Sequence, residues 1–344
     1  MNYYSFLIIA IIFSSLYFFL SRFPLLKEDT NYSIHKNIGK NNKNPIVLGG
    51  IYFLIVVLVL IPNLSIVFKS IIILLTFLGI LSDKNILPSP KIRLLIQIFL
   101  LLFLVLYEGL NIYDLKIDFL NSLLSLQLFN LAFIVFCLAI LINGSNFIDG
   151  LNGLLTGYYL VVLISLFILD YHNDGIFLTD EVFLKIIFFS LLFFFIFNLL
   201  GHVYLGDSGS YLISLLIGVY LINFYSLNSN YSSPYYIASL LWYPAFENFY
   251  SLSRRILIKQ NLSTPDNHHL HQLFFLFLKN NQFFRKKNPN TISGTLIVIF
   301  NIPSMIISTF YASHTKLLVA IILLNILLYC LFYYILSKKL LIKK

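Results

Sequence analysis

The stretch LINGSNFIDGLNGLLTG at 141–157 follows a long apolar run and holds the densest cluster of polar side chains and glycines in the chain. Asn143, Asn146 and Asp149 recur at every third position, so a helix would place them on one arc of about 120°. The glycines that follow leave room for another group to approach the backbone closely. A carboxylate at the end of a membrane span is costly unless it is paired or functional. The stretch therefore predicts either a functional site or a glycine-rich bend between two spans.

The composition is that of a membrane protein. Hydrophobic residues make up 59% of the 344 residues and charged residues only 11%, whereas a soluble domain carries about a quarter charged residues. We therefore expect an all-α, polytopic integral membrane protein with a single membrane-embedded domain over residues 1–344. Cys137 and Cys330 lie in apolar runs, which predicts packing rather than a disulfide framework. Residues 1–20 lack a basic n-region and a cleavage site, which favours a retained first span over a signal peptide.

Apolar windows long enough to cross about 30 Å of hydrocarbon occur along the whole chain. They lie near 4–20, 46–62, 66–82, 92–107, 128–142, 154–170, 184–200, 211–226, 235–253, 291–311 and 317–337. These windows predict about 11 transmembrane helices. The segment 109–127 is amphipathic, so we expect a surface helix or loop there.

The basic residues orient these spans. With the N-terminus outside, all but four of the 23 Lys and Arg residues fall in inner loops or the C-terminal tail. The four exceptions are Lys69, Lys116, Lys185 and Lys316. This asymmetry predicts that the polar ends at the basic side face the cytoplasm.

Five acidic residues fall at or near the inner ends of spans or in inner loops: Asp83, Asp149, Asp207, Glu247 and Asp266. Polar clusters surround them, so these separate segments predict one composite site on the cytoplasmic face. Glu247 lies inside the ninth predicted span. We expect it to be structural and paired with a basic group or an amide from another span.

The segment 78–97, LGILSDKNILPSPKIRLLIQ, joins the third and fourth spans. Asp83 ends the third span, whereas Lys91 and Arg93 open the fourth. A carboxylate that faces two cations across a short proline-bearing loop suits a phosphate with its metal ion. We expect Asp83 to be functional, and we expect Arg93 only to anchor the end of its span by snorkelling into water.

The segment 201–210, GHVYLGDSGS, places small residues around an acid just before another span. Such a loop presents backbone N–H groups that suit an oxyanion, and Asp207 suits a divalent metal. A simple turn is the alternative. The GDSG tetrapeptide does not indicate a serine protease, because nothing in this chain resembles a soluble β-barrel.

The longest inner loop, 254–290, combines arginines with histidines. Arg255 and its arginine neighbour offer planar, permanently charged phosphate contacts. His269 and His271 are two residues apart, so they share a face only if the backbone is extended. This pair suits a metal or a diphosphate, and a solvated histidine cluster is the alternative. No H-E-x-x-H or paired C-x-x-C motif occurs, which argues against a zinc site.

Five motifs occur in order along the chain. They are PIVLGG at 45–50, SDKNILPSPK at 82–91, NGSNFIDGLNGL at 143–154, VYLGDSGS at 203–210 and PDNHHLHQL at 265–273. Together they resemble the polyprenyl-phosphate N-acetylhexosamine-1-phosphate transferases of glycosyltransferase family 4. The corresponding family elements are P-x-x-G-G, D-D with a downstream basic residue, N-x-x-N-x-x-D-G-x-D-G-L, G-D-x-G-S and H-x-H-H. Members move a sugar phosphate from a UDP-sugar to undecaprenyl phosphate.

Three positions depart from the family pattern. Ser82 replaces the first acid of D-D, Asn152 replaces the second aspartate of D-G-x-D-G, and Gln272 replaces the last histidine. A branch of the family is similar to this chain at the first two positions and in the segment 242–255, so the departures do not indicate a dead enzyme. They do remove potential Mg²⁺ ligands. The branch resemblance also points away from the enzyme that transfers a muramoyl-pentapeptide.

The resemblance implies a mechanism. Mg²⁺, with Mn²⁺ as a substitute, would bridge the diphosphate, held chiefly by Asp149 with Asp207 as a second contact. Asp83 would take any remaining proton from the lipid phosphate, and Lys91 would hold that phosphate. An aspartate acting as covalent nucleophile in two displacements is the alternative. The implied substrate-binding residues are Asn143, Asn146, Asn152, Arg255, His269 and His271.

The implied partners are a UDP-sugar, undecaprenyl phosphate and the lipid bilayer, without nucleic acid and with a homodimer as one option. The implied location is the bacterial inner membrane, with the active site facing the cytoplasm. The product would initiate a surface glycan such as the O-antigen of lipopolysaccharide, although the sequence leaves the sugar and the pathway open. The rival function is a transporter or flippase, which usually places its ionisable groups near the bilayer midplane rather than at span ends.

Overall fold

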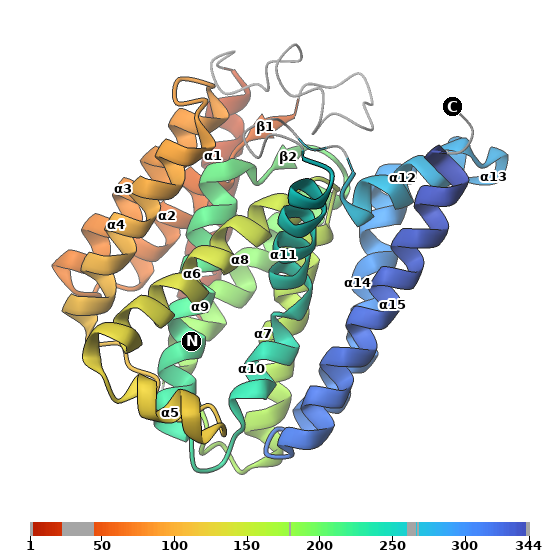
Figure 1. Cartoon of the computed structure of the whole chain (residues 1–344). Helices are drawn as coiled ribbons and strands as arrows, with labels where there is room; N and C mark the ends of the chain where they lie inside the picture. Colours follow the sequence, from red (N-terminus) through yellow and green to blue (C-terminus); the bar gives the residue numbers. More distant parts are fainter. Residues whose placement is uncertain (1–2, 23–44, 179, 260–265, 267, 342–344) are drawn as a thin grey trace.

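The computed structural model describes residues 3–22, 45–178, 180–259, 266 and 268–341. These residues form a helical bundle with one short pair of strands (Figure 1). In chain order the elements are α1 (Tyr3–Ser21), β1 (Ile46–Val47), α2 (Gly49–Leu60), α3 (Ile66–Asp83), α4 (Pro90–Glu108), α5 (Asp118–Leu124), α6 (Gln127–Ile148), α7 (Leu154–His172), α8 (Glu181–Leu199), β2 (Val203–Tyr204), α9 (Gly206–Asn228), α10 (Pro234–Leu240), α11 (Trp242–Leu257), α12 (Leu270–Asn280), α13 (Gln282–Arg285), α14 (Pro289–Phe310) and α15 (Thr315–Leu341).

The predicted all-α polytopic architecture is confirmed. Among the described residues, nine helices are long and apolar enough to cross a membrane. The predicted window 46–62 corresponds to α2, which has only 12 residues. The window 235–253 is divided into α10 and α11, which meet at Leu241. The break has a local cause, because Pro244 lacks an N–H and its ring would clash with the carbonyl of Leu240 in a continuous helix.

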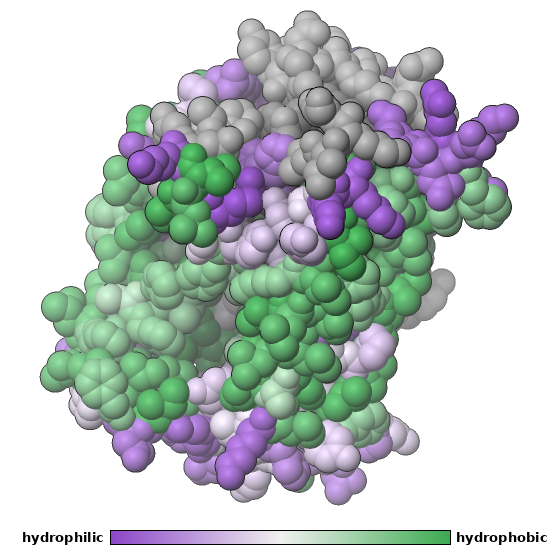
Figure 2. Space-filling view, turned by 45° about the vertical axis from the view of Figure 1, so that its right-hand side comes forward, coloured by the Kyte–Doolittle hydropathy of each residue, from purple (hydrophilic) through white to green (hydrophobic). Residues whose placement is uncertain are grey.

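The surface agrees with this arrangement (Figure 2). Hydrophobic residues form a broad belt around the middle, and hydrophilic residues gather at the two ends. At the upper end in Figure 1 lie β1, β2 and α12, whereas the predicted surface helix α5 lies at the opposite end. The carboxyl-terminal ends of α3 and α6 and the start of α9 therefore share the end that also carries α12.

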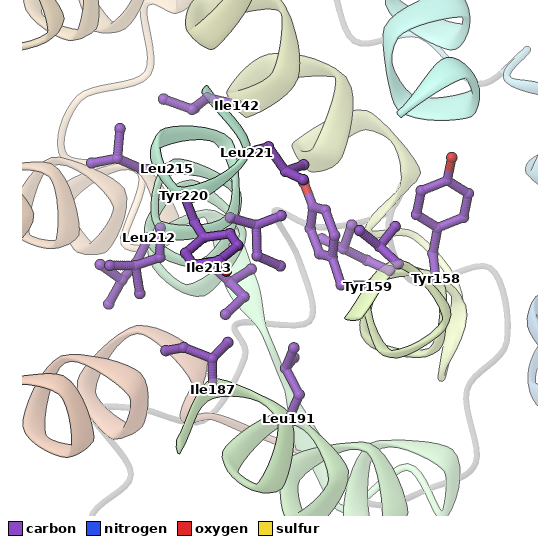
Figure 3. Packing of buried hydrophobic residues seen from close by; sticks show 14 of the residues in the cluster. Ile142, Tyr158, Tyr159, Ile187, Leu191, Leu212, Ile213, Leu215, Tyr220 and Leu221 are labelled. Atoms are coloured by element: carbon purple, nitrogen blue, oxygen red, sulfur yellow. The ribbon is translucent and has the colours of Figure 1, made fainter. Parts of the chain in front are cut away.

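The helix α9 is the centre of the bundle. Nearly all of its length is buried, and it packs against α2, α3 and α6. Figure 3 shows its residues Leu212, Ile213 and Leu221 surrounded by side chains of α6, α7 and α8. A helix that is hydrophobic on all sides belongs in the interior of a bundle. Its first residues are consequently held by several neighbours at once.

The two strands fix the position of that first turn. Ile46 pairs with Val203 in a parallel register, which brings the glycines after β1 against the start of α9. A Cβ on Gly49 would lie 2.5 Å from the Leu205 carbonyl oxygen, and one on Gly50 would lie 2.5 Å from Ser208 Oγ. The GG pair of PIVLGG is therefore needed for this close approach.

Candidate active site

The N-terminus of α9 is capped by a carboxylate from α3. The Asp207 N–H donates to Asp83 Oδ1 at 2.7 Å, and the Ser208 N–H and Oγ donate to Asp83 Oδ2 at 3.2 and 2.9 Å. The first N–H groups of a helix have no partner within the helix, and the helix dipole favours an anion there. Gly206 has φ of 73°, and a Cβ on it would lie 2.8 Å from Asp83 Oδ2. The predicted oxyanion-binding loop thus binds the protein's own Asp83.

A second set of contacts joins the same turn to α4. Arg93 Nη1 lies 3.4 Å from Asp207 Oδ2, and Ser82 Oγ hydrogen-bonds to both side chains. The prediction that Arg93 only anchors a span end was wrong, because its guanidinium turns inward to a buried carboxylate. Lys91 is the exposed cation of the pair. Ser82, which replaces an acid, serves as the bridge between Arg93 and Asp207.

The end of α6 carries the predicted polar arc. Asn143 Nδ2 donates to Gln97 Oε1 on α4 at 2.9 Å. Asn146 Oδ1 accepts from Ser210 Oγ on α9 at 3.4 Å. Asp149 is the C-cap residue of α6 and is half-buried. The spacing of three residues therefore does turn the side chains of Asn143 and Asn146 toward neighbouring helices at this end of the bundle.

Asn152 has a different set of neighbours. Its backbone N–H donates to Asn290 Oδ1 at 2.7 Å, and its Nδ2 donates to Thr291 Oγ1 at 3.4 Å. A Cβ on Gly294 would lie 2.4 Å from the Asn152 carbonyl oxygen. These contacts hold the turn between α6 and α7 against the start of α14. The substrate-binding role of Asn152 stays a prediction.

The buried Glu247 of α11 binds the histidine segment. His269 Nδ1 lies 2.9 Å from Glu247 Oε1, and its Nε2 lies 3.8 Å from Asp266 Oδ2. Asp266 also pairs with Arg254 and accepts from Ser251 Oγ at 2.8 Å. Glu247 was expected to pair with a basic group or an amide from another span. Its partner is indeed a basic residue, but His269 is the N-cap of the short helix α12 and does not lie on a span. The network attaches this segment to α11.

His271 completes this cluster. Its ring stacks on that of His269, with centroids 5.6 Å apart and planes within 14°. The extended backbone at His269 (φ −69°, ψ 149°) gives the shared face that the H-x-H spacing required. Burial and the neighbouring His269 charge lower the pKa of His271 to about 3, so its ring is neutral near pH 7. Gln272 Oε1 accepts from the His269 N–H at 3.2 Å and so stabilises the start of α12.

The last turn of α6 and the residues after it contact both groups of residues. A Cβ on Gly150 would lie 2.6 Å from His271 Nε2, while Asn146 on the preceding turn contacts α9. Asp149 lies between these two positions, and the mostly buried Arg255 projects from the same α11 that carries Glu247. Asp149 thus lies in the chain between a residue that contacts α9 and a residue that lies against the histidine cluster.

The acids do not form a closed metal cage. Within the described ranges, no group of three or more His, Cys, Asp or Glu side chains could hold a metal ion. Mg²⁺ is usually bound by one or two carboxylates together with substrate phosphates. Asp149 could be such a carboxylate. Asp207 is paired with Arg93, so a metal ion bound by Asp207 would have to share the carboxylate with the guanidinium. The role of Asp207 as a metal ligand stays a prediction.

Two residues of this region were missed or misjudged from the sequence. Arg93 was assigned to the membrane interface, and Gln97 was given no role. Both lie on one face of α4, four residues apart. A glutamine inside an apolar span is itself a signal, since polar groups at membrane depth are costly.

Comparison with known proteins agrees with the motifs. Residues 64–225, which contain α3 to α8, β2 and most of α9, match the model of glycosyl transferase family 4. A probable undecaprenyl-phosphate N-acetylglucosaminyl 1-phosphate transferase of Bacillus subtilis (strain 168) is 31% identical over 206 residues, which cover 58% of this chain and 55% of the relative. The undecaprenyl-phosphate alpha-N-acetylglucosaminyl 1-phosphate transferase of Thermotoga maritima is 30% identical over 135 residues, 39% of each chain.

A more distant relative has a similar name. The decaprenyl-phosphate N-acetylglucosaminephosphotransferase of Mycobacterium leprae is 27% identical over 149 residues, 38% of this chain and 37% of the relative. The chain thus spans about half the length of the Bacillus relative and less of the other two. The family predicted from the five motifs is thus confirmed over residues 64–225.

Proposed function

We propose that this chain, whose residues 64–225 belong to glycosyl transferase family 4, transfers N-acetylglucosamine 1-phosphate from a UDP-sugar to undecaprenyl phosphate and releases UMP. The names of the relatives support the sugar and the polyprenyl acceptor. The observation that carries the proposal is the position of Asp149, between Asn146, which contacts α9, and Gly150, which lies against His271. Anionic substrates that meet there would find cations on both sides.

The nucleotide diphosphate fits the side of His269 and Arg255. Arg254, Arg255 and the histidines lie at the inner end of α11 and the start of α12, where a soluble substrate arrives from water. A guanidinium suits phosphate oxygens because it is planar and permanently charged. Asp149 would hold Mg²⁺ together with the diphosphate, and the ion would supply charge withdrawal from the reacting phosphorus.

The chemical step is a displacement at phosphorus. An oxygen of the lipid phosphate forms a bond to the sugar-bearing phosphorus, and the bond to UMP breaks. A phosphate monoester is already anionic and nucleophilic, so the protein mainly has to position it and neutralise its charge. Lys91 and Arg93 are the cations at the start of α4 for this purpose. A covalent aspartyl intermediate in two displacements is the alternative.

Asp83 was expected to accept the proton of the lipid phosphate. Because both of its oxygens accept hydrogen bonds from the first turn of α9, we propose that its main task is to position that turn. A proton acceptor would in addition need a free lone pair directed at the substrate. The two roles predict different behaviour of Asp83→Asn, which the Discussion develops.

The surrounding assignments belong to the same proposal. The protein would act in the bacterial inner membrane with this site facing the cytoplasm, as the distribution of Lys and Arg favours. Its product would begin a surface glycan such as the O-antigen. Ionisable groups gathered at one end of the bundle, rather than at the midplane, favour the transferase over a transporter or flippase.

The test is UMP release by detergent-purified protein supplied with Mg²⁺, undecaprenyl phosphate and a panel of UDP-sugars. We expect release that requires the lipid and is fastest with UDP-N-acetylglucosamine. Asp149→Asn should lower the rate at least about 100-fold, since a single catalytic electrostatic contact is often worth that much. Transport of a substrate without UMP release would contradict the proposal and favour the rival function.

A further inference from the structure

Gln97 is a completely buried polar side chain on the inner half of α4. Its Oε1 accepts from Asn143 Nδ2 at 2.9 Å, whereas its Nε2 has no hydrogen-bond partner among the described residues. Asn143 Nδ2 also donates to the Ala139 carbonyl at 2.8 Å, which fixes the orientation of that amide. The oxygen of Gln97 must then face Asn143, and its NH₂ group must point elsewhere.

An unpaired NH₂ group at this depth calls for a partner. Water is scarce inside a membrane bundle, so a buried donor without an acceptor destabilises the protein. Leucine or methionine at position 97 would fill a similar volume without that cost. The contact between α4 and α6 uses only the oxygen of Gln97, so both hydrogens of the amide lack an acceptor among the described residues.

The surroundings indicate which ligand. Arg93 lies four residues before Gln97 on the same face of α4, about 6 Å nearer the cytoplasm. Three polar contacts then join the inner ends of three helices pairwise. They are Arg93 to Asp207 between α4 and α9, Gln97 to Asn143 between α4 and α6, and Asn146 to Ser210 between α6 and α9. The Gln97 amide therefore lies within a polar junction that carries a guanidinium on its water side.

We propose that Gln97 Nε2 donates a hydrogen bond to the phosphate of the polyprenyl phosphate acceptor, while Arg93 compensates its charge. The inference rests on the proposed function. A lipid-linked phosphate enters from the bilayer side, at the depth of Gln97, whereas a soluble diphosphate enters from the side of His269 and Arg255. Arg93 is also paired with the Asp207 carboxylate, so the phosphate would share this guanidinium with Asp207.

The proposal is tested by separating the two substrates kinetically. Gln97→Leu removes the donors, and Gln97→Glu replaces them with a carboxylate of the same shape. Both should raise the KM for undecaprenyl phosphate at least about tenfold, as expected for a hydrogen bond to a charged group, and Gln97→Glu should raise it more. The KM for the UDP-sugar should change less than about twofold, since that substrate does not contact the amide.

Asn301→Leu is the matched control. Asn301 is also buried within the bundle and has one amide atom without a partner among the described residues, but it lies on α14. It should leave both KM values unchanged. If Gln97→Leu lowers only the thermal stability or kcat and leaves the lipid KM at the wild-type value, Gln97 is a structural clamp and the proposal is wrong.

Direct binding separates this inference from the proposed function. Undecaprenyl phosphate should raise the melting temperature of the wild-type protein and raise it far less for Gln97→Leu, without any UDP-sugar present. Undecaprenol, which lacks the phosphate, should stabilise both proteins equally. If no UDP-sugar supports UMP release but this difference appears, the proposed reaction fails and the phosphate site stands. Equal stabilisation of both proteins by undecaprenyl phosphate would overturn the site.

Discussion

Asp83→Asn should loosen the start of α9. In the wild-type protein, Oδ1 accepts from the Asp207 N–H at 2.7 Å, and Oδ2 accepts from the N–H and Oγ of Ser208. The asparagine side chain has only one acceptor oxygen. Its NH₂ group must face either the Ser208 donors or the Asp207 N–H. An unsatisfied buried donor costs about 1–3 kcal/mol. The lost charge at the helix N-terminus adds about 0.3–1 kcal/mol.

We therefore expect the free energy of unfolding to fall by about 2 kcal/mol. Thermal unfolding in detergent would show this as a lower melting temperature, and the UMP-release assay should show lower turnover with UDP-sugar binding largely intact. Asp180→Asn is the control, because Asp180 caps α8 with a single contact, to the Phe183 N–H at 3.0 Å, which asparagine can also accept.

The two explanations of Asp83 differ in one readout. If Asp83 mainly positions α9, stability and turnover fall together, and the control changes neither. A loss of turnover at unchanged melting temperature would refute the positioning argument and support a role in proton transfer. Unchanged turnover at a lower melting temperature would remove Asp83 from catalysis.

Three further predictions concern neighbouring residues. Arg93→Ala should raise the KM for undecaprenyl phosphate more than Lys91→Ala does, because Arg93 faces the buried Asp207 whereas Lys91 is exposed. Equal KM values for the two variants in UMP-release kinetics would contradict this prediction. Gly150→Ala should lower kcat at least about tenfold in the same assay, since a Cβ would lie 2.6 Å from His271 Nε2 and displace the turn that holds Asp149. The pKa of His271 is about 3 in the folded protein against 6.5 ordinarily, so the unfolded chain binds the extra proton between these values. Stability should consequently fall as pH is lowered from about 6.5, and melting curves of His271→Gln should show a shallower pH dependence.

Much of the fold could be predicted because a bilayer requires long apolar helices with internally satisfied backbones. The apolar windows corresponded to nine full helices, the short α2, and the α10–α11 pair. The division at Leu241 could be predicted only from Pro244, because a hydropathy window does not register the effect of a proline on a helix. The helix α2 is short because the start of its window forms β1, which pairs with the distant β2.

The site was predictable in its members but not in its contacts. The acids at span ends indicated one polar face, and the spacing of Asn143 and Asn146 indicated shared orientation. The pairing of Asp83 with the start of α9 joins residues 124 positions apart, and that of Arg93 with Asp207 joins residues 114 apart. Such pairs depend on how each helix is rotated about its axis, and an apolar span surrounded by lipid and by other apolar helices carries little signal of that rotation.

The cap on α9 also has a consequence for the assembly of the protein during synthesis. The carboxylate of Asp83 and the strand β1 emerge from the ribosome long before residues 203–228, to which they bind. Until α9 enters the membrane, the first helices lack the element around which they pack. Chains truncated before residue 203 should therefore remain sensitive to protease in membranes, and chains extended through residue 228 should become resistant in one step. The central helix would then set the moment at which the amino-terminal half becomes a folded unit.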